Sequence, residues 1–167
     1  FDGLWLLSYS KNVYAVDPED LAVRIHFSLN TFVSQPVLDT YGNILIGDQG
    51  KKVGAFGNGL YVLNSQGTVL RYVPALPNIS NIAPTESFIF TDSMCFYDDG
   101  YCGFSLIDRN NAYAVTTNMT MSNYVVHSGR QWIHNNQLYV GTAEFPSQSR
   151  PASFFTIDCL SGNVSLP

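Results

Sequence analysis

The sequence is poor in charge and has no cationic cluster. Only 13% of the 167 residues are charged, the formal net charge is −5, and Lys51-Lys52 is the single cationic doublet. Nucleic-acid binding needs clustered Lys and Arg against phosphates, so nucleic acid is not expected as a partner. No apolar run approaches the roughly 20 residues that span a bilayer, which predicts no membrane span in this chain.

Helix patterns and catalytic motifs are also missing. No long stretch repeats apolar residues at positions i, i+3, i+4 and i+7. The motifs G-x-S-x-G, H-E-x-x-H, G-x-G-x-x-G and the P-loop do not occur. Gly54–Gly59 is rich in glycine, but no helix pattern follows it, as a phosphate-binding loop would require. We therefore expect no enzyme activity, no catalytic residue and no cofactor.

Apolar and aromatic residues dominate instead. Hydrophobic residues make up 46% of the chain and aromatic residues 14%, with ten Tyr and eleven Phe. A disordered chain has more charge and fewer rings, so a folded domain with a core is expected. Short runs of Val, Ile, Leu, Tyr and Phe are bounded by Gly, Asn, Asp and Pro, a pattern that predicts an all-β fold.

One strand–turn–strand pattern occurs four times. In NGLYVLNSQGTVLRY, Asn64 separates an aromatic-aliphatic strand from a polar turn and a second strand. Its side chain can accept hydrogen bonds from backbone N–H groups two residues on, which suits a tight turn. The four anchor residues are Asp17, Asn64, Asp108 and Asp158. Their spacings of 47, 44 and 50 residues indicate a repeat of the kind found in solenoids and propellers.

A further strand ends at a fixed distance before three anchors. Asp48, Asp92 and Thr142 close these strands, each 16 residues before the next anchor. Leu4–Ser8 is the matching strand of the first copy, and weaker strands at QPVLDTY, SNIAPTE and RQWIHNN precede the others. The sequence thus predicts one all-β domain over residues 1–167, a β-propeller-like array of about four four-stranded antiparallel blades. The repeats are expected at about 1–34, 35–77, 78–124 and 125–167.

The layout G-N-I-L-I-G followed by L-Y-V-L-N-S-Q-G-T-V-L resembles the PQQ-like repeat of quinoprotein-type β-propellers. The resemblance covers Leu4 to Leu166, but the closing Trp is missing from every copy, and the turn glycine remains only as Gly67 and Gly162. Propellers of this kind usually have six to eight blades. The resemblance therefore implies a segment of a larger propeller, a small four-bladed ring closed by strand exchange, or an array completed by another chain.

The resemblance also raises the possibility of a PQQ-type dehydrogenase, which we rank last. Those enzymes use adjacent cysteines, a stacking Trp and a calcium site of acid and amide ligands in a complete ring. In this chain no two cysteines are adjacent, and Trp5 and Trp132 occupy strand positions.

The histidines and central acids show no metal-ligand pattern. Three histidines fall in different repeats without a nucleophile motif beside them, and we interpret them as surface or strand residues: His26, His127 and His134. Three acids lack the alternating spacing of a calcium loop and are interpreted as turn residues: Asp92, Asp98 and Asp99. No metal site is expected.

Three features favour a secreted, extracellular or luminal protein. Lys is scarce while Tyr, Asn and Ser are plentiful. Cys95 and Cys102 lie seven residues apart across a turn and predict a disulfide, with two reduced thiols as the alternative. Cys159 is either a buried free thiol or the partner of a cysteine elsewhere. Three sequons predict N-glycans, at Asn78, Asn118 and Asn163.

The loops between the second and third strands are long and would emerge on one face of a propeller. Exposed aromatic residues with polar neighbours suit contact with protein or glycan, although ordinary solvated loops are the alternative. The candidate binding face comprises Lys51, Lys52, Phe56, Phe96, Tyr97, Asp98, Asp99, Tyr101, Phe145 and Arg150.

The function expected from the sequence is that of a non-enzymatic extracellular or luminal interaction and assembly module. Its expected partner is a protein, either a further copy of itself in a homo-oligomer or the remainder of a larger propeller, or else a glycan. The alternative is a luminal scaffold domain of a larger membrane complex. Fold does not fix function in propellers, so the identity of the partner stays open.

Overall fold

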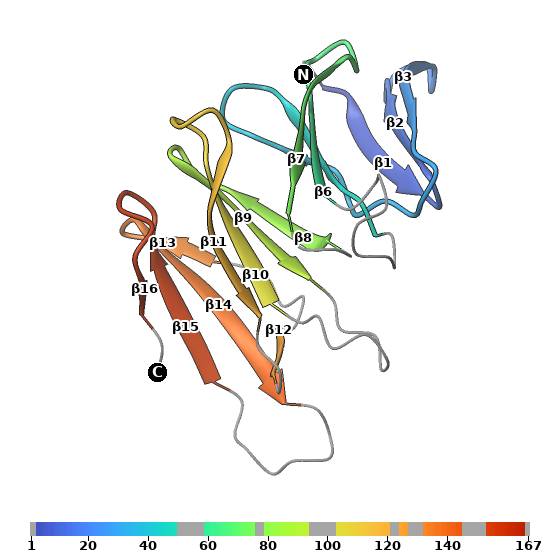
Figure 1. The fold of residues 1–167 in the computed structure, drawn as a ribbon. Helices are drawn as coiled ribbons and strands as arrows, with labels where there is room; N and C mark the ends of the chain where they lie inside the picture. Colours follow the sequence, from blue (N-terminus) through green and yellow to red (C-terminus); the bar gives the residue numbers. More distant parts are fainter. Residues whose placement is uncertain are drawn as a thin grey trace.

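The chain folds into a row of antiparallel β-sheets (Figure 1). The computed structural model describes residues 3–49, 59–75, 79–93, 103–120, 124–126, 132–144 and 153–165. Within these ranges there are sixteen strands and no helix. A search of the same residues for a helix long and apolar enough to cross a membrane finds none. The strands form four sheets, which we call blades 1 to 4 in chain order.

The blades follow the chain without crossovers between them. Blade 1 contains β1 (Trp5–Tyr9), β2 (Asn12–Val16) and β3 (Val23–Ser28). Blade 2 contains β4 (Val37–Leu38), β5 (Ile44–Gly47), β6 (Gly59–Leu63) and β7 (Val69–Pro74). Blade 3 contains β8 (Ile79–Pro84), β9 (Phe88–Ser93), β10 (Gly103–Asp108) and β11 (Ala114–Thr120). Blade 4 contains β12 (Tyr124–Val126), β13 (Trp132–His134), β14 (Gln137–Glu144), β15 (Ser153–Asp158) and β16 (Val164–Ser165).

The predicted all-β array of four antiparallel blades is confirmed, although blade 1 has three described strands and blade 4 has five instead of the expected four. Blades 2 and 3 have four strands each in sequential order, and in blade 4 the strands β12 and β13 pair with different parts of β14. Blade 1 has three strands instead of four, because in the described part of the chain β1 pairs with β2 alone. No described strand pairs with the other edge of β1, where a first strand would lie.

The anchor residues act as predicted. In every blade the anchor side chain accepts a hydrogen bond from the backbone N–H two residues later, which closes the turn between the last two strands of the blade. The pairs are Asp17–Glu19 at 3.0 Å, Asn64–Gln66 at 3.0 Å, Asp108–Asn110 at 2.9 Å and Asp158–Leu160 at 3.0 Å.

In blade 3, the residue 16 positions before the anchor does not occupy the same place in the sheet as its predicted counterparts in blades 2 and 4. Asp92 pairs with Phe104, four residues before the anchor, and in blades 2 and 4 that place opposite the third strand is held by glycines, Gly47 and Gly141. The residue equivalent to Thr142 is therefore Ser93. The expected match is wrong by one residue because the connection from β9 to β10 is one residue shorter.

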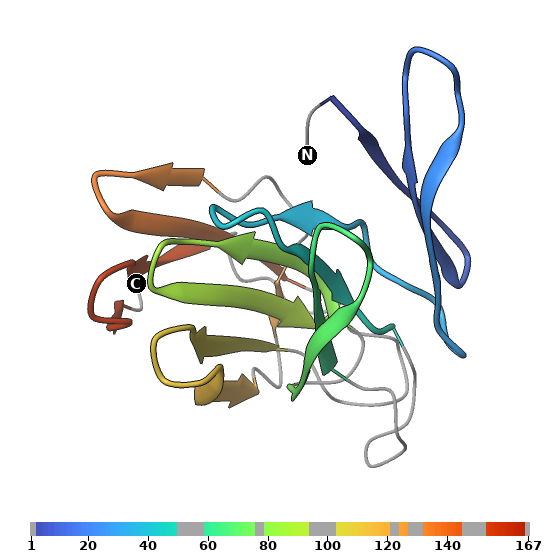
Figure 2. The same ribbon diagram turned by 90° about the horizontal axis from the view of Figure 1, so that it is seen from above.

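Three apolar core clusters lie between neighbouring blades. Figure 2 shows the ribbon from above, with blade 1 in blue at the right and blade 4 in orange and red at the left. In β5, Ile44 and Ile46 join a cluster with blade 1, whereas Leu45 joins a cluster with blade 3. Successive side chains of a strand point to opposite faces, so an inner blade needs apolar residues at consecutive positions. This explains the uninterrupted apolar runs of the sequence. Each fully buried aliphatic side chain contributes about 1.5–3 kcal/mol.

Candidate functional site

Most of the sequence-predicted site residues lie outside the described residues. All ten residues of the candidate binding face do so, as do Cys95, Cys102, Asn78 and His127. Two predicted glycosylation residues, Asn118 in β11 and Asn163 in the turn before β16, are described and exposed. Exposure is what attachment of a glycan requires.

Asp92 is a buried strand residue, which corrects its interpretation as a turn acid. It lies in β9 and accepts hydrogen bonds from Ser80 Oγ at 2.5 Å, Asn81 N at 2.9 Å and Asn81 Nδ2 at 2.8 Å. Burial raises the pKa of its carboxyl, against the opposing effect of these hydrogen bonds. Asp92 therefore fixes β8 to β9 within blade 3. Within the described ranges, no cluster of three or more His, Cys, Asp or Glu side chains could hold a metal ion.

Cys159 is a buried free thiol between blades 3 and 4. Burial, with a smaller effect of Asp158, raises the pKa of this thiol, so its reactive thiolate is disfavoured. The two described histidines lie on exposed strand positions, His26 in β3 and His134 in β13. Each stacks on an aromatic ring of its own blade, Tyr14 and Trp132 respectively.

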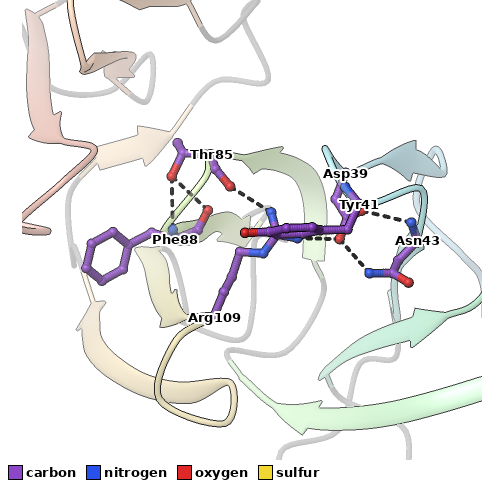
Figure 3. Close-up of polar contacts among 6 residues, drawn as sticks. All are labelled: Asp39, Tyr41, Asn43, Thr85, Phe88 and Arg109. Carbon is purple, nitrogen blue, oxygen red and sulfur yellow. Dashed lines mark hydrogen bonds and ion pairs between the residues drawn. The ribbon is translucent and has the colours of Figure 1, made fainter.

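Blades 2 and 3 are joined by a buried ion pair (Figure 3). Arg109 Nη2 lies 2.6 Å from Asp39 Oδ2, and both side chains are almost fully buried. The second guanidinium nitrogen, Nη1, donates to the carbonyl of Thr85 at 2.7 Å, and Tyr41 covers the guanidinium at 4.3 Å. Asn43 also donates to Asp39 through its backbone and side-chain nitrogens. The interface between blades 2 and 3 therefore contains a specific polar contact in addition to its apolar cluster.

Every inner blade has two covered faces. We call the face toward the next blade in the chain the following face and the other the preceding face. The residue four positions before each anchor lies on the following face. At this position Val13, Leu60 and Phe104 are buried against the next blade, whereas Phe154 of blade 4 is 60% exposed. The following face of blade 4 thus has the same type of surface as the covered faces, and no blade covers it among the residues that the structure describes.

The following face of blade 4 is aromatic. A stripe of three rings runs across three strands of this face. The ring centroid of Tyr139 lies 5.4 Å from that of Trp132 and 6.3 Å from that of Phe154. Trp132 is 60% exposed and stacks on His134. At the edge of the stripe, Gln137 Nε2 donates to Asp158 Oδ2 at 2.9 Å. Large exposed rings beside satisfied polar groups are typical of protein interfaces.

A glycine marks the same face. A Cβ atom at Gly47 would lie 2.7 Å from Ile79 Cβ, because the first strand of blade 3 passes directly over it. Gly141 holds the equivalent position in blade 4, and a Cβ atom there would have no neighbour within 4 Å. A glycine inside a strand weakens the strand unless another chain segment approaches closely. Gly141 therefore leaves room for a close approach on this face of blade 4.

The preceding face of blade 1 is the second open surface. Trp5 pairs with Val16, the residue directly before the anchor of blade 1. The residues that pair with the same position in the other blades are Ile44, Ile89 and Leu138. Those three residues are buried, whereas Trp5 is 54% exposed. Leu7 and Tyr9 follow on the same side of β1 and are 49% and 77% exposed.

Polar groups of blade 1 extend this face. His26 stacks on Tyr14 with a centroid distance of 4.9 Å and an interplanar angle of 5°. His26 Nε2 lies 3.0 Å from Asn12 Oδ1, and Ser28 Oγ donates to the same oxygen at 2.6 Å. Next to the exposed apolar residues of β1 there is thus a set of hydrogen-bonded polar side chains.

The residues predicted from the sequence for the binding face lie on loops. No residue was predicted on the two end faces, which are the following face of blade 4 and the preceding face of blade 1, and the buried ion pair of Arg109 was not predicted. The signal for the end faces was present in the repeat. Once the anchors are aligned, Phe154 falls at a position that is apolar in every copy, and Trp5 falls at another. No local signal marked Arg109, because its partner Asp39 lies in another repeat.

Comparison with known proteins adds little to this site. No protein-family model matches the chain, and no curated protein matches it in sequence. One solved structure similar to it is "Dihydro-heme d1 dehydrogenase NirN in complex with DHE", with 12% identity and a TM-score of 0.42. The match covers 98% of this chain and 44% of that one. A similarity of this size carries no inference about activity.

Proposed function

We propose that the protein is a non-enzymatic interaction and assembly module of the extracellular space or of a lumen, and that it binds protein through the end faces of its blade array. The observation that carries the proposal is the exposure of Trp5 and Phe154 at positions that are buried in the other blades. Exposed apolar patches of this kind mark interaction sites in soluble proteins.

Protein is the class of partner that these faces suit best. The inner blades show what covers such a face, namely the sheet of another blade with apolar side chains. A sheet surface of Trp, Leu and Tyr side chains has the composition of the buried centre of protein interfaces. The resemblance to PQQ-like repeats agrees with a propeller scaffold that presents such faces.

The extracellular or luminal setting rests on composition and sequons. Asn118 and Asn163 are exposed, and neither lies among the aromatic residues of the end faces. Glycans at both positions are therefore compatible with a partner on those faces. The predicted disulfide of Cys95 and Cys102 belongs to the same proposal.

The mass of the native particle tests the proposal. The chain would be expressed through the secretory route and its particle weighed before and after treatment with peptide-N-glycosidase. We expect the particle to contain further protein and so to be heavier than one chain of 18.5 kDa. We also expect its mass to fall when the glycans are removed. A particle of one bare chain, found in its native source and without bound protein, would contradict both parts of the proposal.

A further inference from the structure

One end face is a following face and the other is a preceding face. Inside the chain, these two types of face pack against each other wherever two blades meet, and we call this contact between blades a joint. We propose that the partner is a second copy of this chain, bound head to tail, with the following face of blade 4 on the preceding face of blade 1 of the other copy. This inference rests on the proposed function and names the partner of the same surfaces.

The three joints inside the chain support this pairing. Each of them places the following face of one blade on the preceding face of the next, with one apolar cluster between them. After these joints, the described chain leaves one face of each type uncovered. A second copy supplies the missing partner at both ends at once. Two joints close the pair into a ring of eight blades, which lies within the usual range of about four to eight blades for propellers.

The side chains of β1 hold positions that in blade 3 lie beside the first strand. In blade 3 the first strand carries Ile79, which pairs with Ser93 and lies over Gly47 of the preceding blade. In blade 1 the pairing position of Ser93 is held by Tyr9, and no first strand pairs with it among the described residues. In a head-to-tail joint its ring therefore comes to the place nearest Gly141 of the other copy, where space for it is open.

The joint would bury apolar surface, and the charged side chains beside that surface already have partners. Arg24 is the basic residue beside the blade 1 face, and it already contacts Asp17 at 3.0 Å and Asp20 at 2.6 Å. On blade 4, Asp158 accepts hydrogen bonds from Leu160 and from Gln137. Unpaired buried charges are among the largest penalties to association, and these charged side chains already have ionic or hydrogen-bond partners within their own chain.

The first experiment measures the mass of the purified chain by sedimentation up to about 100 µM, well above the Kd of a specific complex. We expect a dimer. Leu7→Asp and Phe154→Asp each place a carboxylate in the joint and should raise the dimer Kd by about 100-fold or more. The matched control is Leu70→Asp, because Leu70 is 56% exposed in β7 of an inner blade and should leave the dimer unchanged. Far-UV spectra verify that each variant is folded.

The second experiment mixes the two variants. Leu7→Asp retains an intact blade 4 face, and Phe154→Asp retains an intact blade 1 face. One joint of the mixed pair is therefore free of substitutions, and a 1:1 heterodimer should form although neither variant self-associates. A symmetric contact between two like faces would not allow such complementation.

Three results would overturn the inference: a wild-type chain that stays monomeric, a Leu7→Asp chain that dimerises as the wild type does, or a mixture that remains monomeric. They are distinguishable from failure of the proposed function. If the native particle contains a different protein that covers Trp5 and Trp132, the function stands and the second copy is wrong. If the native particle is a bare chain, both are wrong.

Discussion

Arg109 Nη2 lies 2.6 Å from Asp39 Oδ2 although the two residues are 70 positions apart in the chain, and this contact fixes blade 3 to blade 2 (Figure 3). Each residue lies in a turn of its own blade. The stacked blades are thus aligned by a polar contact at one end of the sheets, while the apolar clusters between them supply most of the stabilisation.

The first prediction concerns this pair. Asp39→Ala leaves the buried guanidinium of Arg109 without its carboxylate, and should lower the free energy of unfolding by about 3–5 kcal/mol. Urea denaturation followed by circular dichroism measures the change. Arg24→Met is the matched control, because Arg24 forms its two ion pairs at the exposed surface of blade 1. It should shift the midpoint far less. Equal shifts for both variants would show that burial of the pair does not matter.

The second prediction concerns the anchor turns. Asn64 Oδ1 accepts hydrogen bonds from the backbone N–H groups of Gln66 at 3.0 Å and Thr68 at 2.9 Å. Asn64→Ala leaves both donors without this acceptor and should cost about 1–2 kcal/mol of stability. Gln66→Ala in the same turn keeps both backbone bonds and serves as the control. Equal melting temperatures for the two variants would show that the hydrogen bonds of Asn64 do not stabilise the turn.

The third prediction is a pH dependence at Asp92. Its pKa is raised in the folded state, chiefly by burial, so the native chain holds this proton more tightly than the unfolded chain does. The contribution of Asp92 to stability is then greatest at low pH. It falls as pH rises from the unfolded value of about 3.9 through the raised pKa. The stability of the wild type relative to Asp92→Asn should decline over that window.

Asp158 provides a control of opposite sign. Hydrogen bonds from Ser161 and Leu160 lower the pKa of its carboxyl. Its contribution is therefore present above the unfolded value and is lost as pH falls through the lowered pKa. Urea midpoints measured from about pH 2 to pH 8 give the stability of the wild type relative to each variant. This difference should fall with rising pH for Asp92→Asn and should increase with rising pH for Asp158→Asn. Parallel curves would contradict the assigned shifts.

The fourth prediction compares two equivalent glycines. Gly47→Ala forces a methyl group against Ile79 and should destabilise the chain by about 1–3 kcal/mol through overpacking. Gly141→Ala meets nothing within 4 Å in the single chain, so it should leave the monomer as stable as before or slightly more so. Gly141→Ala should nevertheless weaken assembly, because its methyl group enters the proposed joint. Unfolding and sedimentation of both variants separate these two effects.

The repeat was readable from the sequence because its determinants are local. Asn64 and Asp158 form hydrogen bonds within three or four residues of themselves, and the alternation of β5 and β6 follows from the strand pleat. Local patterns of this kind survive in a single sequence. They sufficed for the all-β class and for the number of blades.

The remaining features depend on contacts between distant segments. The pairing of Arg109 with Asp39 joins two turns, and neither turn carries a mark of the other. Asp92 reads as a turn acid by its residue type, yet its register with Phe104 places it inside β9. Trp5 is an apolar residue that the repeat predicts to be in the core, yet it is exposed, because none of the described blades packs against its face of blade 1.

The most direct test of the account is the solvent accessibility of Trp5 and Trp132, the only two tryptophans of the chain, one on each end face. Acrylamide quenching would be measured on the native particle and on its dissociated chains, with Trp5→Phe and Trp132→Phe to assign the two signals. The account predicts that both tryptophans are shielded in the particle and quenched in the free chain. Equal quenching in the two states would show that the end faces stay open to solvent, and would contradict the central claim that this protein assembles through them.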